Sequence, residues 1–346
     1  RAAATVDRGD AAGLPVSPAA VRDRTWLSIQ HLRGFAALSV VLFHACQWSQ
    51  INFATGQAGV DVFFVISGFV MWTTTTGEPV GPLAFLKRRV IRVVPLYWLI
   101  TLALAAGVLL FPARFPDLAV TPGHLALSMA FVQHMNPAGY PFPLLAPGWT
   151  LNYEAVFYLA FAGLLWLPES RRLVALTFAL MVLAFAGFAW PPAYQMLLNP
   201  LFLEFLGGVW LARMAQTRLL PDRSIGWLLL GAGVGLFVVI QLVNMDWDLW
   251  RPMVWGAPAI MLVAGAVSIE ADGGWKPIPG LRALGDASYS TYLIHPLTIG
   301  ALAMTIGAWN PWIFIPSAIV VAVVSGLACW RLVERPMLNR LRQPLA

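Results

Sequence analysis

The sequence predicts an all-α, polytopic membrane helix bundle of about ten transmembrane helices plus one short re-entrant or interfacial helix. Of the 346 residues, 59% are hydrophobic and only 11% are charged, whereas an average soluble domain has about 45–50% apolar and about 25% charged residues. The mean hydropathy of +0.72 agrees. So few charged side chains cannot cover so much apolar surface in water. This excludes soluble enzymes, soluble nucleic-acid-binding proteins and disordered chains.

Ten apolar stretches are long enough to cross a bilayer. A spanning helix needs about 20 mostly apolar residues, because the hydrocarbon layer is about 30 Å thick. The sequence has such stretches at about 34–51, 58–76, 94–111, 149–167, 173–190, 198–214, 226–244, 253–269, 287–307 and 312–331. A further run at 123–135 is shorter and ends in Asn136 and Pro137. We therefore expect ten crossings and one short helix.

The placement of Lys and Arg predicts the orientation of these helices. If the N-terminus is cytoplasmic and 123–135 does not cross, 20 of the 22 cations lie on the cytoplasmic side, and only Arg114 and Arg251 lie outside. If 123–135 crossed, eleven of those 20 cations would move to the outer side. Because cytoplasmic loops carry the excess of Lys and Arg, we expect 123–135 to be re-entrant or interfacial and both termini to be cytoplasmic.

The ends of the chain and its two cysteines complete the predicted organisation. Residues 1–25 show no hydrophobic periodicity, so we expect a disordered cytoplasmic arm rather than a signal peptide. Residues 26–338 form the transmembrane domain, and residues 339–346 a cytoplasmic tail. Cys46 and Cys329 both lie in apolar runs, so we expect neither a disulfide framework nor a metal site.

Arg33 and His44 are the first pair of ionisable residues in a predicted membrane helix, with Arg33 directly before the apolar stretch and His44 within it. Inserting such a residue costs about 2.5–3.5 kcal/mol, which makes each one a functional candidate. Eleven residues separate the two, so they share a helix face about 16 Å apart, with Arg33 at the cytoplasmic rim and His44 near mid-membrane. An imidazole there can accept and return a proton. The alternative is an anchoring arginine and a packed core histidine.

Two carboxylates and a group of cations are the next candidates. Asp61 enters the second stretch from the outer side, where it could orient an imidazole or bind a sugar hydroxyl; the alternative is a first-turn acid favoured by the helix dipole. Four cations lie just before the third stretch, at the cytoplasmic end of its predicted helix: Lys87, Arg88, Arg89 and Arg92. They could bind phosphate or serve only as a positive-inside signal that contacts lipid headgroups.

Glu154 lies five residues after Trp149, and therefore about 7.5 Å deeper in the membrane than this interfacial residue. No neighbour in the sequence pairs with Glu154, so we expect its partner on another helix; the alternative is a structural ion pair or a neutral carboxyl. Glu204 and His295 are interpreted as structural. For His295 the reason is Pro296, which frees a helix carbonyl that the imidazole can bind.

These clusters, taken in order, resemble the membrane acyltransferase-3 family of bacterial O-acyltransferases. The resemblance covers about residues 26–338. It rests on Arg33 and His44, on 59–69, on Arg89 and Arg92 before 95–98, and on 149–154, 284–296 and 333–336. Thr150 stands where the family commonly has Ser, a change that keeps the hydroxyl. Each motif alone is modest, but their order and spacing are specific.

The resemblance implies a multi-pass protein of the bacterial inner membrane that takes an acetyl or other short acyl group from cytoplasmic acyl-CoA, without a metal. The acceptor is commonly a hydroxyl of a cell-surface or exported glycan, and in some members a small molecule such as a macrolide. It implies no nucleic-acid partner. The expected catalytic residues are His44, Arg33, Glu154 and Asp61, and the expected donor-binding residues are Arg33, Arg88, Arg89 and Arg92.

Two mechanisms and one other function remain open at this point. His44 could act as general base on the acceptor hydroxyl, or it could carry the acyl group transiently. In either case Glu154 or Asp61 would orient the imidazole or hold the sugar. Alternatively, the same intramembrane residues could form the proton relay of a transporter for a small solute or glycan precursor. Against this, the sequence has no detectable paired half-repeats, which many transporters show.

Overall fold

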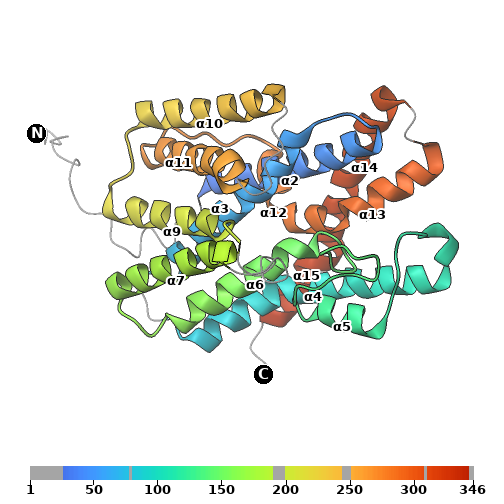
Figure 1. Cartoon of the computed structure of the whole chain (residues 1–346). Coiled ribbons are helices and arrows are strands. Elements are labelled where there is room, and N and C mark those ends of the chain that lie inside the picture. The colour runs from blue at the N-terminus through green and yellow to red at the C-terminus, as the bar shows by residue number, and fades with distance from the viewer. Residues whose placement is uncertain (1–25, 78–79, 190–198, 244–250, 308–309, 343–346) are drawn as a thin grey trace, which may run out of the picture.

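The computed structural model describes residues 26–77, 80–189, 199–243, 251–307 and 310–342, and the described part contains helices and no strand. The predicted arm 1–25 and residues 343–346 lie outside this part. All ten predicted apolar stretches form helices. They are α2 (Leu27–Trp48), α3 (Gly59–Thr75), α4 (Pro82–Leu110), α6 (Gly148–Gly163), α7 (Glu169–Ala189), α9 (Phe202–Thr217), α10 (Arg223–Val243), α11 (Ala257–Ala271), α13 (Ser288–Ile306) and α14 (Pro311–Cys329). In Figure 1 most of these helices run side by side along one direction.

Six helical stretches in the described residues are long and apolar enough to cross a membrane. They contain α2, α3, α4, α10, α11 and α14. The other four predicted stretches, α6, α7, α9 and α13, form helices but are not among these six candidate spans. α6 and α9 have 16 residues each, which is about 24 Å of helix. The structure therefore supports a polytopic helical protein with six clear candidate spans, and ten crossings remain a prediction.

The remaining helices are short and join or extend the long ones. The run predicted at 123–135 forms only α5 (Pro122–Met129), whose eight residues reach about 12 Å and cannot cross a bilayer. Sequence analysis missed α12 (Leu281–Asp286) and α15 (Arg335–Arg342). The others are η1 (Ala54–Ala58), η2 (Pro112–Arg114), and the π-helical turns η4 (Pro252–Gly256) and η5 (Trp330–Glu334). The predicted tail at 339–346 thus begins inside α15.

Helix α2 lies at the centre of the bundle and packs against α3, α13 and α14. Its first turn is held by Glu270 of α11, whose carboxylate accepts hydrogen bonds from the backbone N–H groups of Leu27 and Ser28 at 2.9 and 2.6 Å. These donors have no partner within the helix, and the helix dipole favours a negative charge at this end. The contact fixes the start of α2 and therefore the depth at which Arg33 and His44 lie.

Glycine allows α3 and α9 to cross in direct backbone contact. A side chain at Gly68 would collide with the backbone of Phe205, and one at Gly208 would collide with the carbonyl of Val65. Small residues at helix crossings are usual in membrane proteins, where close packing replaces the hydrophobic effect. The close crossing holds α3 in place, and with it Asp61 and Ser67.

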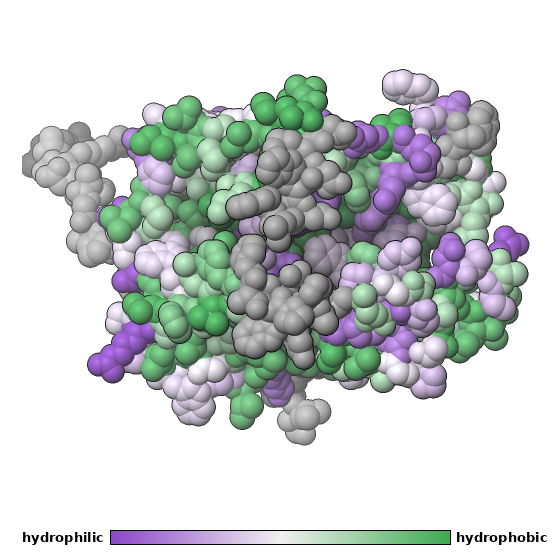
Figure 2. All heavy atoms as spheres, viewed as in Figure 1, coloured by the Kyte–Doolittle hydropathy of each residue, from purple (hydrophilic) through white to green (hydrophobic). Residues whose placement is uncertain are grey.

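Apolar side chains cover much of the outer surface. α10 alone exposes Trp227, Leu228, Val234, Leu236, Val238, Val239, Leu242 and Val243, and Figure 2 shows hydrophobic residues in green over this helix. A monomeric soluble protein rarely exposes apolar patches of this extent. The surface therefore agrees with a helix bundle that contacts lipid.

Candidate active site

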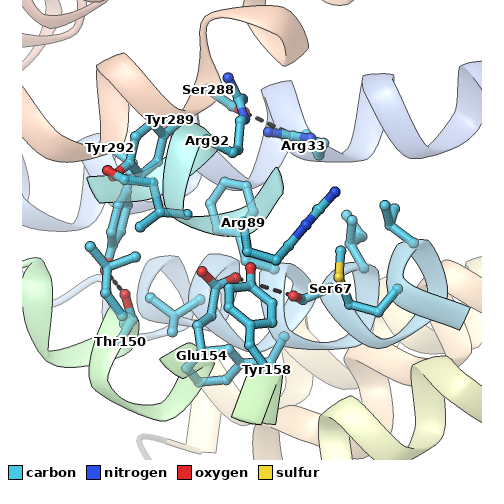
Figure 3. A pocket seen from close by; sticks show the side chains of 18 residues that line it. Arg33, Ser67, Arg89, Arg92, Thr150, Glu154, Tyr158, Ser288, Tyr289 and Tyr292 are labelled. Carbon is cyan, nitrogen blue, oxygen red and sulfur yellow. Dashed lines mark hydrogen bonds between the residues drawn. The ribbon is translucent and has the colours of Figure 1, made fainter. Parts of the chain in front are cut away.

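A cavity of about 130 Å³ lies between α2, α3, α4, α6 and α13. This volume is large enough for several water molecules. Figure 3 shows its polar side chains pointing toward one another from these helices. They are Arg33, Ser67, Arg89, Arg92, Thr150, Glu154, Tyr158, Ser288, Tyr289 and Tyr292. Four of the residues predicted from the sequence, Arg33, Arg89, Arg92 and Glu154, therefore meet in one cavity.

Glu154 is the carboxylate that lines this cavity. Its Oε1 atom accepts a hydrogen bond of 3.2 Å from the hydroxyl of Ser67 on α3, so the predicted partner on another helix is present. A second partner is Tyr158, one turn further along α6, which the sequence analysis missed although its i+4 position places it on the same face. Arg33 and Arg89 lie near enough to interact electrostatically with the carboxylate.

Three guanidinium groups line the cavity opposite Glu154. Nε of Arg33 donates to the hydroxyl of Ser288 at 3.2 Å. Arg92 forms an ion pair with the buried carboxylate of Glu334, in the π-helical turn η5. Nε of Arg89 is buried and has no hydrogen-bond partner among the described residues. A buried charged donor without an acceptor is costly, which makes Arg89 suited to an anionic ligand.

A second cavity of about 390 Å³ opens between α2, α4, α12, η5 and α15, on the predicted cytoplasmic side. Arg33 and Arg92 line both cavities, so the two adjoin at these guanidinium groups. The other lining residues are Gln30, Gly285, Asp286, Trp330, Arg335, Leu338, Asn339 and Arg342. The second cavity therefore holds four arginines around one opening.

Two of these four arginines, Arg335 and Arg342, are functional candidates that the sequence analysis did not single out. They are seven residues apart on α15, which is two turns and places both on one helix face. That spacing was visible in the sequence, but the segment was assigned to a motif and a tail. Arg335 stacks its guanidinium over the ring of Trp330, 5.6 Å from the centroid.

His44 lies outside the lining of both cavities. Its Nδ1 contacts Oε1 of Gln47 at 3.2 Å, and its ring packs against His295 with 5.0 Å between centroids. Among the described residues, neither Glu154 nor Asp61 is hydrogen-bonded to it. The predicted orientation of the imidazole by a carboxylate is thus not present in this structure.

Tyr292 separates the His44–His295 pair from the first cavity. The Tyr292 ring lines the cavity and lies 5.8 Å from the ring of His295. Its hydroxyl contacts the hydroxyl of Thr150 at 3.1 Å. Nδ1 of His295 is 2.6 Å from the carbonyl of Tyr292, as expected from the helix carbonyl that Pro296 leaves without a donor.

Asp61 and Arg88 lie apart from the cavities. Asp61 is fully buried in the first turn of α3, where Arg251 donates to both of its carboxylate oxygens at 2.7 and 3.2 Å. Glu204 lies next to this pair and interacts with Asp61, in space that Gly256 leaves free. Arg88 is exposed on α4. Asp61 is therefore part of a separate buried polar cluster.

The segment that follows α4 carries a pair of histidines at the predicted outer face. Nδ1 of His124 lies 2.7 Å from Nε2 of His134, and burial together with the neighbouring imidazole lowers the pKa of His124. α5 is held to α4 by Tyr97, whose hydroxyl donates to the carbonyl of Ser128 at 3.1 Å. Within the described part of the chain, no group of three or more His, Cys, Asp or Glu side chains could hold a metal ion.

Comparison with known proteins agrees with this arrangement. Residues 26–331 match the family described as "Acyltransferase domain". The exopolysaccharide production protein ExoZ of Rhizobium meliloti (strain 1021) is 37% identical over 311 residues, which cover 87% of this chain and 96% of that protein. The acyltransferase MdmB of Streptomyces mycarofaciens is 28% identical over 92% of this chain and 94% of its own length.

A third relative matches over a shorter region. The O-acetyltransferase OatA of Staphylococcus aureus (strain NCTC 8325 / PS 47) is 30% identical over 148 residues, or 38% of this chain and 23% of that protein. No solved structure matches the chain. The family match spans nearly all of the described residues, and it includes every residue predicted from the sequence to act in catalysis or donor binding. The chain therefore belongs to the membrane acyltransferase-3 family.

Proposed function

We propose that this protein is an O-acyltransferase of the bacterial inner membrane that moves an acetyl or other short acyl group from cytoplasmic acyl-CoA to a hydroxyl acceptor. The observation that carries the proposal is the pair of adjoining cavities that share Arg33 and Arg92. One is a wide opening lined by arginines, and the other is a small polar chamber inside the bundle. This arrangement suits a donor with a phosphate-rich end and a short reactive group.

The cytoplasmic opening fits the phosphates of acyl-CoA. Arg33, Arg92, Arg335 and Arg342 face it, whereas Asp286 is the carboxylate among its lining residues. Guanidinium groups bind phosphate oxygens bidentately, and such charge-assisted hydrogen bonds are stronger than neutral ones. We assign Arg335 and Arg342 to donor binding in addition to Arg33, Arg89 and Arg92. Arg88 receives no such role because it is exposed and lines neither cavity.

The inner cavity is suited to the acyl end of the donor. Acyl-CoA supplies a thioester, whose carbonyl carbon is the point of attack. A chamber of about 130 Å³ has room for a short acyl group and little more, which favours acetyl over long acyl chains. The unpartnered Nε of Arg89 can donate to oxygen in the chamber, and Glu154 with Ser67 and Tyr158 can orient polar atoms there.

His44 is our candidate for the proton-accepting residue, because an ionisable residue inside an apolar helix is costly and is usually functional. Nδ1 of His44 contacts the amide oxygen of Gln47, so the proton of the neutral ring is on Nδ1 and the lone pair is on Nε2. Nε2 can then take the proton of an acceptor hydroxyl. The same nitrogen could instead become acylated for a short time.

A hydroxyl of a sugar in a cell-surface or exported glycan is the acceptor that we favour. The support is the exopolysaccharide production protein ExoZ, which is similar over almost the whole of both chains. A small hydroxyl-bearing molecule such as a macrolide is the second choice. The topology predicts short outer loops at 51–57, 191–197 and 244–252. Of these, 191–197 and the part 244–250 lie outside the described residues. We place both termini in the cytoplasm because of the predicted distribution of cations.

The experiment uses the purified protein in lipid nanodiscs with radiolabelled acetyl-CoA. The acceptor is polysaccharide from a strain in which the gene is deleted. We expect labelled polysaccharide and one free CoA per acyl group, and we expect His44→Ala to abolish both while binding CoA normally. Saturable solute uptake without CoA release would contradict the proposal. Acyl-imidazoles hydrolyse quickly in acid, so the intermediate is sought by rapid denaturation near neutral pH. Label that stays on the protein under these conditions, and is absent in His44→Ala, would indicate a covalent acyl-histidine.

A further inference from the structure

We propose that His295 is a positioning residue that shares with His44 the proton removed from the acceptor. This inference rests on the proposed function, and it gives a role to a buried side chain that the mechanism above does not use. His295 lies on α13, only 1% exposed, with its ring beside that of His44. Its Nε2 atom has no hydrogen-bond partner among the described residues.

The protonation of His295 follows from the backbone around it. Pro296 has no N–H group, so the carbonyl of Tyr292, four residues earlier, receives no helix hydrogen bond from it. Nδ1 of His295 lies 2.6 Å from that carbonyl oxygen and must carry a hydrogen to donate to it. In the neutral ring the other nitrogen then holds the lone pair. Nε2 of His295 is therefore a buried acceptor without a donor.

His44 is held in the same tautomer. The amide oxygen of Gln47 is an acceptor and lies 3.2 Å from Nδ1 of His44, so that nitrogen donates and Nε2 is left with its lone pair. Two lone pairs cannot bond to each other. One additional proton, however, would join the two Nε2 atoms in an N–H···N hydrogen bond. The neutral pair is thus arranged to hold a single proton.

The separation of the two rings permits such a bond. The ring centroids of His44 and His295 are 5.0 Å apart. In the same protein, His124 and His134 have ring centroids 4.9 Å apart and nitrogens in hydrogen-bond contact at 2.7 Å. Rotation about χ2 of histidine is broad rather than confined to sharp wells. Because the two centroid distances are nearly equal, the spacing of His44 and His295 is compatible with a nitrogen–nitrogen hydrogen bond once a ring turns.

His295 is the neighbour that can stabilise a protonated His44 ring, because no carboxylate is placed to do so among the described residues. In many hydrolases a carboxylate stabilises the imidazolium that forms when histidine takes a proton. In the described part of this chain, Asp61 is ion-paired with Arg251, and Glu154 bonds to Ser67 on the far side of Tyr292. Neither carboxylate is hydrogen-bonded to His44. A neutral imidazole that accepts a hydrogen bond can replace the carboxylate as the partner of the protonated ring.

His44, His295 and the CoA thiolate together account for the proton that the acceptor loses during the transfer. The O–H bond of the acceptor breaks, and its proton passes to Nε2 of His44 and is held between the two imidazoles. The acceptor oxygen forms a bond to the acyl carbon, and the bond between that carbon and sulfur breaks. The leaving thiolate of CoA takes up a proton, and the histidine pair returns to its neutral form. No other co-reactant is required.

The test must separate proton sharing from the structural task of covering the Tyr292 carbonyl. In His295→Asn the side-chain amide can still donate to that carbonyl but cannot carry the proton. With acetyl-CoA and deletion-strain polysaccharide, we expect kcat to fall about ten- to a hundredfold, while KM for acetyl-CoA and the affinity for CoA stay unchanged. Wild-type turnover in His295→Asn, in an assay where the wild type is active, would overturn the inference. An inactive wild type would instead contradict the proposed function.

A second pair of variants tests the structural explanation directly. Alanine at position 296 restores a backbone N–H for the Tyr292 carbonyl, so the histidine is no longer needed there. If His295 were only structural, the double variant His295→Ala/Pro296→Ala would recover the turnover that His295→Ala loses. We expect no recovery, because proton sharing requires the imidazole. Recovery to the wild-type rate would overturn the inference.

Discussion

Arg251 donates hydrogen bonds to both carboxylate oxygens of Asp61, at 2.7 Å through Nη2 and 3.2 Å through Nε. Asp61 is fully buried, and the arginine side chain is 15% exposed. Arg251 was one of two cations that the topology prediction left on the outer side. The ion pair gives a reason for this exception: the charge is neutralised within the bundle, where it links η4 to the first turn of α3.

We expect removal of this pair to affect stability more than chemistry. Asp61→Asn removes the charged carboxylate that accepts two hydrogen bonds from Arg251, and breaking a buried pair from one side costs about 3–5 kcal/mol. The double variant Asp61→Asn/Arg251→Met is expected to lose less than the sum of the two single variants. Thermal unfolding in nanodiscs measures these changes, with the exposed Asp117→Asn as a control. Additive losses would contradict the coupling.

Much of the fold could be predicted because it depends on local pattern. Apolar length located all ten long helices, and the positive-inside rule separated the short run at α5 from them. The assignment of His295 to the carbonyl freed by Pro296 was also correct, since both groups lie on one helical turn. The number of crossings is not confirmed in the same way, because α6, α7, α9 and α13 are helices but are not among the six candidate spans of the described residues.

The parts that sequence analysis missed depend on contacts between distant segments. Asp61 and Arg251 are 190 residues apart, and no spacing rule links them. The sequence therefore left Asp61 open between a functional role and a first-turn acid, and its position in the first turn of α3 agrees with the second. The second cavity combines residues of α2, α4, α12 and α15, which only the packing of the bundle brings together. The surroundings of Glu154 were predicted in part. The sequence indicated a partner on another helix, but only the structure shows that this partner is Ser67.

Glu154→Gln is expected to reduce turnover strongly. The amide keeps the size of the side chain and can still accept the Ser67 hydroxyl, but the negative charge near Arg33 and Arg89 is lost. We expect kcat to fall about 10²- to 10³-fold, measured as CoA release with deletion-strain polysaccharide. Ser67→Ala retains the charge and is the matched control, with an expected loss of less than about tenfold. Equal losses in both variants would mean that the charge is not what matters.

Arg335→Gln and Arg342→Gln are expected to weaken donor binding without changing the chemical step. Both side chains line the cytoplasmic cavity, and loss of a charge-assisted hydrogen bond to phosphate should raise KM for acetyl-CoA about tenfold. Arg340→Gln removes the same charge from the same helix at a residue outside the cavity lining. We expect it to behave as the wild type. A similar rise in KM for all three variants would indicate a general charge effect instead of a defined site.

The His124–His134 pair predicts a local loss of stability at acidic pH. Burial and the neighbouring imidazole lower the pKa of His124 in the folded protein, whereas an unfolded histidine titrates near pH 6.5. Between the two pKa values the unfolded segment binds more protons, so the contribution to stability is present above about pH 6.5 and is lost as the pH falls. Hydrogen exchange of the backbone amides of residues 122–134 at pH 7.5 and 5.0 measures this change in local stability. Because intrinsic amide exchange is itself slower at pH 5.0, protection factors are compared instead of raw rates. We expect lower protection at pH 5.0 than at pH 7.5 in the wild type and a smaller difference in His124→Gln; equal pH dependence in both proteins would show that another group is responsible.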